Sequence, residues 1–300
     1  MFGKILVPLD AGQVSEEALP VVAALAGALG DPVAVVSVIP DPGDLNPLVS
    51  KYDAVLHDLD VGRRAYASTY LEGVRGRLEA KGVHVAAAVR AGDPAAEILA
   101  AAAADGAGLI AMATHGRSGP ERWFVGSVAD RVVHSAPMPV LLVRPGERPH
   151  PEQVSDIIVP LDGSPVAERA LPVAMQLAQA LSARVTLVRT VASGWLNAGT
   201  DMYGGTTMSP DVITVIEDDA RAYLEATAAR LRGGTVEVQT SFALFHAPDL
   251  QIDEIAVDCP APLVVMTSHG RSGVERALLG SVADRVVRSS TAPVLVIRDA

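Results

Sequence analysis

The chain has 300 residues, of which 49% are hydrophobic but only 4% aromatic, which predicts two domains with aliphatic cores that need no metal or disulfide to fold. Its net charge of −11 argues against a general nucleic-acid or membrane-surface binder, since both partners are anionic. The single cysteine, Cys259, excludes an intrachain disulfide and fits a reducing compartment, and without a leader-like or bilayer-length apolar run we expect a cytoplasmic protein.

Short apolar runs alternate with helical patterns through the first half of the chain. In order, we expect a strand at Ile5–Leu9, a helix at Ser15–Leu29, a strand at Val33–Ile39, a helix at Leu59–Lys81, a strand at Val83–Val89, a helix at Ala95–Ala104, a strand at Leu109–Ala113, a helix at Val128–Ser135 and a strand at Val140–Val143. The strands are continuous and rich in Val, Ile and Leu, as strands buried on both faces are. Their alternation with helices predicts a parallel sheet with right-handed crossovers and helices on both faces.

The second half repeats this order after a linker at Pro145–Val154, so we expect domains at residues 1–146 and 155–300. Its strands are expected at Ile157–Leu161, Val185–Val191, Val236–Phe242, Leu263–Met266 and Val294–Ile297, and its helices at Val166–Leu181, Val212–Arg232, Leu250–Val257 and Val282–Ser289. Longer irregular segments at Pro40–His57 and Ala192–Pro210 follow the second strand of each half. Each is interpreted either as a lid at the carboxyl edge of the sheet or as a plain surface loop.

The two halves also match residue by residue. His115 to Arg144 and His269 to Arg298 share twenty of thirty aligned positions without a gap, and KILVPLD at Lys4–Asp10 matches DIIVPLD at Asp156–Asp162. One domain-sized unit therefore occurs twice, and every expected site has a counterpart.

A glycine–serine pair opens the fourth predicted helix of each half. Gly116 follows the fourth strand closely, and Gly126-Ser127 begins the next helix. Unpaired N–H groups and the partial positive charge at such a helix start favour phosphates. The alternative is a plain helix start, with Ser127 as its cap and Asp130 completing a capping-box pattern. The second copy consists of Gly270, Gly280, Ser281 and Asp284.

Aspartates end the first strand of each half, Asp10 after Pro8 by two positions and Asp162 after Pro160. An aspartate there can accept hydrogen bonds from a ribose hydroxyl or an adenine amino group. The equally open alternative is that it caps the following helix.

Arginines cluster around the glycine loops, where Arg117 and Arg271 could pair with a triphosphate. Surface ion pairs are the alternative for them and for the matched residues Arg122, Arg131, Arg276 and Arg285. Lysine is scarce and no G-x-x-x-x-G-K-[ST] motif occurs, so the chain is not a P-loop NTPase.

The sequence contains few of the residue groupings that are typical of enzyme active sites. His115 and His269 each lack a second histidine or cysteine at metal-ligand spacing, which favours a structural role. Cys259 is expected to be a small buried apolar residue rather than a nucleophile. We therefore expect no catalytic or metal-ligating residue.

Together these motifs resemble the universal stress protein family in its tandem two-domain form, over nearly the whole chain. The resemblance rests on ILVPLD and IIVPLDGS, on GDPAAEIL at Gly92–Leu99, on MATHGRSG and MTSHGRSG, and on GSVADRVV before APMPVLLVR and TAPVLVIR. It implies Rossmann-like α/β domains, each with an open sheet of about five parallel strands in the order 3-2-1-4-5. It also implies ATP, with Mg²⁺ on its phosphates, at the carboxyl ends of the strands.

The resemblance further implies roles for individual residues. Asp10 and Asp162 would hold the adenosine part, near Pro8 and Pro160, and Val38 and Thr190 would meet the adenine through their backbone. The phosphates would be surrounded by Ala113, Gly116, Arg117, Gly126, Ser127 and Val128 in the first half and by Thr267, Gly270, Arg271, Gly280, Ser281 and Val282 in the second.

Some positions depart from the family pattern. The first glycine of the phosphate motif is Ala113 in one half and the stiffer, branched Thr267 in the other. The turn D-G-S is kept after Asp162 but reads D-A-G after Asp10, and Gly92 aligns with His246. The first half is therefore the better candidate for nucleotide.

The expected function is a nucleotide-dependent stress-response protein that binds ATP and signals through its bound state. The alternatives are an interaction module without nucleotide and a slow ATPase or phosphotransferase. The apolar last strands, Val140–Val143 and Val294–Ile297, need cover, and the resemblance implies an internal pseudo-dimer of the halves, with a homodimer and an unidentified protein partner also open.

Overall fold

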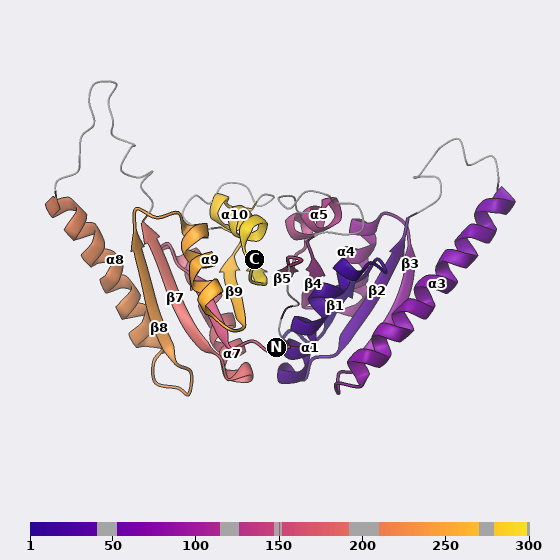
Figure 1. Ribbon diagram of the computed structural model, residues 1–300, viewed down its shortest axis with the longest axis horizontal. Coiled ribbons are helices and arrows are strands. Elements are labelled where there is room, and N and C mark those ends of the chain that lie inside the picture. Colours follow the sequence, from indigo (N-terminus) through magenta and orange to yellow (C-terminus); the bar gives the residue numbers. More distant parts are fainter. Residues whose placement is uncertain are drawn as a thin grey trace, which may run out of the picture. The chain divides into compact units, whose positions relative to one another are not determined.

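The computed structural model describes residues 1–40, 53–114, 126–146, 150, 152–191, 210–269 and 279–298. The chain divides into two compact units, unit 1 at Met1–Gln153 and unit 2 at Val154–Asp299, shown as ribbons in Figure 1. Among the described helices, none combines the length and the apolar character needed to cross a bilayer.

Unit 1 contains a parallel sheet in the order β3-β2-β1-β4-β5, with Ile5 of β1 level with Val33 of β2 and Leu109 of β4. Its elements are β1 (Ile5–Pro8), the 3-10 helix η1 (Gln13–Ala18), α1 (Leu19–Leu29), β2 (Val33–Ile39), α3 (Asp53–Glu79), β3 (Val85–Ala91), α4 (Pro94–Asp105), β4 (Leu109–Ala113), α5 (Ser127–Ser135) and β5 (Val140–Val143).

Unit 2 repeats this arrangement as β8-β7-β6-β9-β10, with Ile157 of β6 level with Val185 of β7 and Leu263 of β9. Its elements are β6 (Asp156–Pro160), α6 (Pro165–Glu168), α7 (Ala170–Leu181), β7 (Arg184–Val191), α8 (Pro210–Leu231), β8 (Val238–Leu244), α9 (Pro248–Asp258), β9 (Pro262–Thr267), α10 (Ser281–Ser289) and β10 (Val294–Ile297). The expected α/β class and strand order are confirmed in both units.

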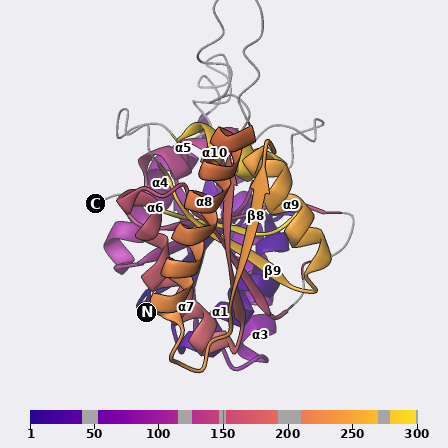
Figure 2. The same ribbon diagram turned by 90° about the vertical axis from the view of Figure 1, so that its left-hand side faces the viewer.

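Helices cover both faces of each sheet because the direction of chain travel reverses once. From β1 to β2 to β3 the chain moves outward in one direction, and from β3 to β4 to β5 it moves the other way. Right-handed crossovers then place α1 and α3 on one face and α4 and α5 on the other. Figure 2 shows α8 and α9, the counterparts in unit 2 of α3 and α4, on either side of β8.

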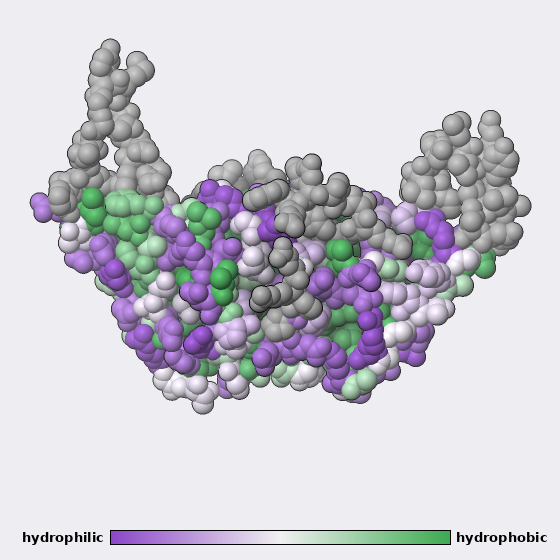
Figure 3. Space-filling model, in the orientation of Figure 1, coloured by the Kyte–Doolittle hydropathy of each residue, from purple (hydrophilic) through white to green (hydrophobic). Residues whose placement is uncertain are grey.

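Burial of the central strands on both faces explains their uninterrupted apolar sequences. Ile5, Leu109 and Leu141 in unit 1, and Ile157 and Leu263 in unit 2, are completely buried. Charged and polar residues cover much of the outer helix surfaces in Figure 3, where apolar residues gather over the upper ends of α8 and β8.

The third strand of each unit begins two residues later than the sequence suggested, at Val85 and Val238 instead of Val83 and Val236. In unit 1 the Val83 N–H is used by the end of α3, where it donates to the Leu78 carbonyl at 3.2 Å. Helix α3 also begins earlier than expected, at Asp53, so the irregular segment Pro40–His57 ends in helix. The rest of that segment, like 192–209, lies outside the described residues.

A glutamate in the short helix after the first strand bonds to an arginine of the long helix in each unit, with a tyrosine nearby. In unit 2, Glu168 accepts from the Tyr223 hydroxyl at 2.9 Å and from Arg230 at 2.8 Å. In unit 1, Glu16 accepts from Arg77 at 2.8 Å, and burial, reinforced by Glu16, raises the pKa of Tyr70. Burial and the hydrogen bond to Glu168 raise the pKa of Tyr223 to about 12.

We predict that Glu168→Gln lowers the free energy of unfolding by about 1 kcal/mol at pH 7, a value discounted for the exposure of Arg230. The Arg230 guanidinium lowers the pKa of Glu168, with a smaller lowering from Tyr223. The carboxylate therefore stabilises the fold above its ordinary pKa, and this contribution disappears as the pH falls through the lowered folded value. Urea unfolding from pH 7 to pH 3 measures it.

Glu217→Gln is the matched control, because among the described residues Glu217 pairs within α8, with Arg221 at 2.7 Å, and such pairs contribute about 0.5 kcal/mol or less. Equal losses for the two variants, or a Glu168→Gln loss that persists at pH 3, would contradict the prediction.

Candidate functional site

A cavity of about 670 Å³ lies in unit 1 at the carboxyl ends of β1, β2 and β4. It sits beside the position where the strand order reverses, between β1 and β4, which is where open parallel sheets bind ligands. The site residues expected from the sequence that line it are Pro8, Asp10, Val38, Ala113, Gly126, Ser127 and Val128. Residues from the end of β1 and from the start of α5 therefore line one cavity.

Asp10 lies at the rim of this cavity, exposed, two residues beyond the buried end of β1. Its Oδ1 accepts from the Gly12 N–H at 2.9 Å, and the Ser15 hydroxyl donates to the Gly12 carbonyl at 2.8 Å. The N-cap of η1 is Gly12, with no side-chain cap bond. Asp10 therefore shapes a turn rather than capping the helix, and its carboxylate stands where a ligand hydroxyl could donate to it.

The turn after Asp10 forces Ala11 into the left-handed region, with φ at 61°. The equivalent position in unit 2 is Gly163, with φ at 84°. A side chain costs free energy in this conformation, whereas glycine adopts it readily. The D-A-G sequence therefore keeps the turn that D-G-S makes in unit 2, with local strain.

Helix α5 begins at the floor of the cavity, with Gly126 as its N-cap and Ser127 as its first residue. The Asp130 N–H donates to the Gly126 carbonyl at 2.9 Å, and the cap residue, a glycine, makes no side-chain cap bond. The N–H groups of a first helical turn have no acceptor within the helix. Those of Ser127, Val128 and Ala129 belong to residues that line the cavity.

The alternative in which Ser127 and Ser281 cap their helices is wrong. Each serine lies inside its helix, and the cap positions are Gly126 and Gly280, neither with a side-chain cap bond. In unit 2 the carboxylate of Asp284 instead accepts from Arg288 at 2.8 Å. A glycine at the cap leaves the helix start open to an outside group.

One wall of the cavity, mostly apolar, was not predicted from the sequence. Ser37 and Val36 come from β2, Tyr66 from α3 and Ile98 from α4, and Arg63 adds a cation from α3. Strand β2 was expected, but nothing in the chain's local pattern indicates which turn of a long helix overhangs the strand ends. Only the packing of α3 on β2 and β3 brings Tyr66 there.

The arginines on the helices after the glycine loops form ion pairs. Both Arg131 amino groups donate to Asp93, at 2.7 and 2.9 Å, and Arg131 lowers the pKa of Asp93. In unit 2, Arg285 lies 3.5 Å from Asp249. The ion-pair interpretation therefore applies to these two residues. The remaining expected loop residues, Gly116, Arg117, Arg122, His115, Gly270, Arg271 and Arg276, lie outside the described residues.

Unit 2 places its expected site residues at the same sheet edge. Pro160 ends β6, Thr190 lies near the end of β7, Thr267 ends β9, and Gly280, Ser281 and Val282 begin α10. Asp162 accepts from the Ser164 N–H at 2.9 Å, and Ser164 caps α6.

Polar side chains at the carboxyl edge of the unit 2 sheet form hydrogen bonds within that unit. The Thr190 hydroxyl donates to Gln251, which is only 4% exposed. The Thr267 hydroxyl donates to the His269 carbonyl at 2.7 Å, and the His269 ring lies 3.1 Å from the Ser268 hydroxyl. The residues that replace Val38 and Ala113 thus satisfy their polar atoms internally, and the structural role expected of His269 fits its contacts.

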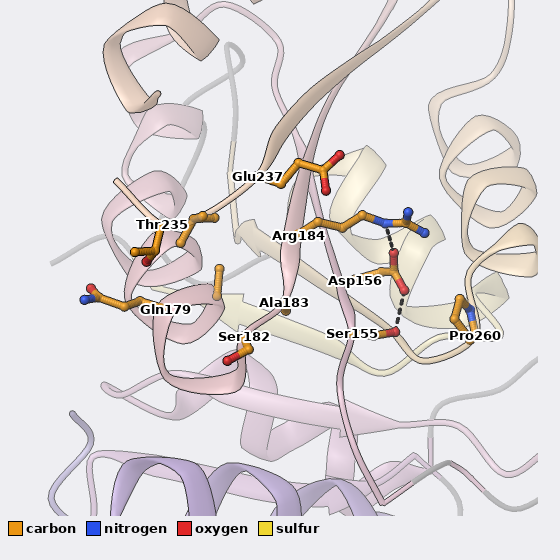
Figure 4. Close-up of a pocket in the computed structure, with 11 residues that line it drawn as sticks. Ser155, Asp156, Gln179, Ser182, Ala183, Arg184, Thr235, Glu237 and Pro260 are labelled. Carbon is orange, nitrogen blue, oxygen red and sulfur yellow. Dashed lines mark hydrogen bonds and ion pairs between the residues drawn. The ribbon is translucent and has the colours of Figure 1, made fainter. Parts of the chain in front are cut away.

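A second cavity of about 510 Å³ lies in unit 2 at the opposite, amino edge of the sheet (Figure 4). Its charged residue Asp156 is 1% exposed and accepts from Arg184 and, at 2.6 Å, from the Ser155 hydroxyl. The buried Asp156 carboxylate already accepts hydrogen bonds from two side chains of the protein, so it needs no ligand. Nearby Cys259 is half-buried, and burial raises the pKa of its thiol, which disfavours the reactive thiolate.

Within the described ranges, no group of three or more His, Cys, Asp or Glu side chains could hold a metal ion.

A family model described as the universal stress protein family matches residues 1–144 and, separately, residues 154–298. The chain belongs to the universal stress protein family. The tandem resemblance read from the sequence is confirmed.

Relatives among universal stress proteins include one from Mycobacterium tuberculosis, 28% identical over 202 residues, or 63% of this chain and 61% of the relative. The chain thus spans less than two thirds of that relative's length. A universal stress protein of Methanocaldococcus jannaschii is 32% identical over 142 residues, covering 47% of this chain and 81% of the relative. The crystal structure of one from Archaeoglobus fulgidus shares the fold over 100% of both chains, with a TM-score of 0.69 and 23% identity.

We predict that Ala11→Gly raises the free energy of unfolding by about 0.5–1 kcal/mol, because it relieves a left-handed alanine. Gly163→Ala, at the equivalent turn of unit 2, should lower it by about 1 kcal/mol. Chemical unfolding followed by circular dichroism measures both.

Ala104→Gly on α4 is the control, and it should destabilise by about 1 kcal/mol because helical glycine is unfavourable. If Ala11→Gly destabilised the protein as Ala104→Gly does, the strain at this turn would be refuted.

Proposed function

We propose that this universal stress protein binds ATP in the cavity of unit 1 and acts through its nucleotide-bound state. The observation that carries the proposal is that one cavity joins the Asp10 carboxylate to the glycine-capped start of α5. Its volume of about 670 Å³ lies within the usual range for small-molecule sites, roughly 300–1,000 Å³.

The nucleoside would occupy the end of the cavity between β2, α3 and α4. Apolar side chains of Val36, Ile98 and Met112 offer contact to a flat base, and Tyr66 adds an aromatic ring at the rim. Backbone groups at Val38 could meet the edge of the base. Asp10 lies where it could accept from ribose hydroxyls, since carboxylates form strong hydrogen bonds to such donors.

The phosphates would lie at the start of α5. Its first-turn N–H groups and its dipole favour an anion, and helix α5 has nine residues over which that dipole builds. Ala113, on the floor, is 7% exposed and small enough to leave room beside Gly126. Mg²⁺ would arrive on the phosphates of the nucleotide.

The lining favours binding over rapid turnover. Among the described lining residues, Asp10 is the only carboxylate, and no histidine or cysteine is present. Asp10 is already engaged with the turn at Gly12, so it is poorly placed to act as a base for an attacking water. Membership of the universal stress protein family supports a nucleotide-dependent role in the stress response.

We predict that calorimetry detects binding of Mg·ATP to the full chain and that Asp10→Asn weakens it about tenfold, which corresponds to ~1.4 kcal/mol. The substitution removes a charged acceptor while keeping the size of the side chain.

Glu237→Gln is the matched control, because it makes the same charge change beside the cavity at the other edge of unit 2. Its affinity for ATP should equal that of the unmodified chain. Absence of heat at millimolar Mg·ATP with folded protein would remove the proposal, and equal weakening by both variants would assign the effect to net charge alone.

A further inference from the structure

The two units differ at the wall where the base would lie. Register identifies the matching residues, because Pro8 pairs with Val36 in unit 1 as Pro160 pairs with Val188 in unit 2. The next residues along these strands are Ser37 and Arg189. A buried serine that lines the cavity of unit 1 is therefore an arginine in unit 2.

The helices that face these residues are matched by their glutamate contacts. Arg230 of α8 bonds Glu168 as Arg77 of α3 bonds Glu16, so these arginines are equivalent. Tyr223 and Tyr70 each stand seven residues before them and are therefore equivalent too. One helical turn earlier stand Tyr66 in unit 1 and Asp219 in unit 2. Tyr66 lines the cavity of unit 1, and its counterpart is a carboxylate.

In unit 2 these replacements contact each other. The Arg189 guanidinium lies 4.8 Å from the centre of the Tyr223 ring and 3.6 Å from the Asp219 carboxylate, and Arg189 as a whole is only 8% exposed. A buried guanidinium needs such partners, since an unpaired buried charge is costly. These three side chains are here called the Arg189 cluster. Arg189 is buried between β7 and α8, whereas the Asp219 side chain is 76% exposed and pairs with it from the surface.

We infer that the chain takes one adenine nucleotide, in unit 1, because the Arg189 cluster fills the nucleoside position of unit 2. The inference rests on the proposed function for its ligand. It assigns Arg189 and Asp219 as the residues that make two duplicated units unequal. A serine and a tyrosine leave room for a base between strand and helix, whereas a paired arginine fills that room.

The test transplants the residues of unit 1 into unit 2, as Arg189→Ser combined with Asp219→Tyr in the full chain. Calorimetry with Mg·ATP should give one site in the unmodified protein and two in this variant. Photolabelling with azido-ATP, mapped on peptides, should mark unit 1 alone before the exchange and both units after it. Circular dichroism reports whether the variant folds.

The reciprocal variant, Ser37→Arg with Tyr66→Asp, keeps the inference falsifiable if the first variant does not fold. It should abolish labelling of unit 1 and weaken calorimetric binding at least tenfold. Retention of binding in that folded variant would overturn the inference.

Other outcomes are equally decisive. If the unmodified chain bound ATP at two sites, or if its unit 2 were photolabelled, the inference would be overturned. A folded unit 2 variant that still binds ATP at one site would overturn it as well. If the unmodified chain bound no nucleotide, the proposed function would fail separately. A site gained by the unit 2 variant would then still support the Arg189 cluster as the obstacle, and no gain would refute it.

Discussion

Each unit depends on one constraint, the right-handed crossover between parallel strands. Because the chain reverses direction after its third strand, α3 and α4 must cover opposite faces, and the crossovers separate above β1 and β4. The buried apolar strands hold this arrangement, and the residues that line the cavity of unit 1 gather at and beyond their carboxyl ends. The cavity of unit 1 follows from topology before any site residue is considered.

Two features of that crevice support the proposed binding of an anion with a polar sugar. Helix α5 starts at a glycine cap, and the residues of its first turn line the cavity, where a helix dipole favours an anion. Asp10 is fixed by a turn that strains Ala11, which places its carboxylate at the rim. Both are properties of backbone geometry, and the side chains contribute mainly by staying small.

Duplication gives this family member two copies of one frame, and the frame tolerates different contents. The arginine–glutamate contact that ties the long helix to the short helix after the first strand recurs in both units, at Glu16 and Glu168. The wall beside it has diverged, with Ser37 in one unit and a buried, partnered Arg189 in the other. Conserving the scaffold contacts while changing one wall alters a site without endangering the fold.

The sequence by itself determined the α/β class, the strand order through the family resemblance, and the residues at the strand ends, because buried parallel strands and glycine-capped helices leave local patterns. Tertiary structure alone decided that Tyr66 and Ile98 complete the cavity of unit 1, that Gly126 rather than Ser127 caps α5, and that Arg189 meets Tyr223 and Asp219. Such contacts join residues far apart in the chain, and local periodicity carries no information about which turn of a long helix overhangs which strand. The physical reason is that strand burial is a local property of the sequence, whereas the contents of a crevice depend on packing between elements.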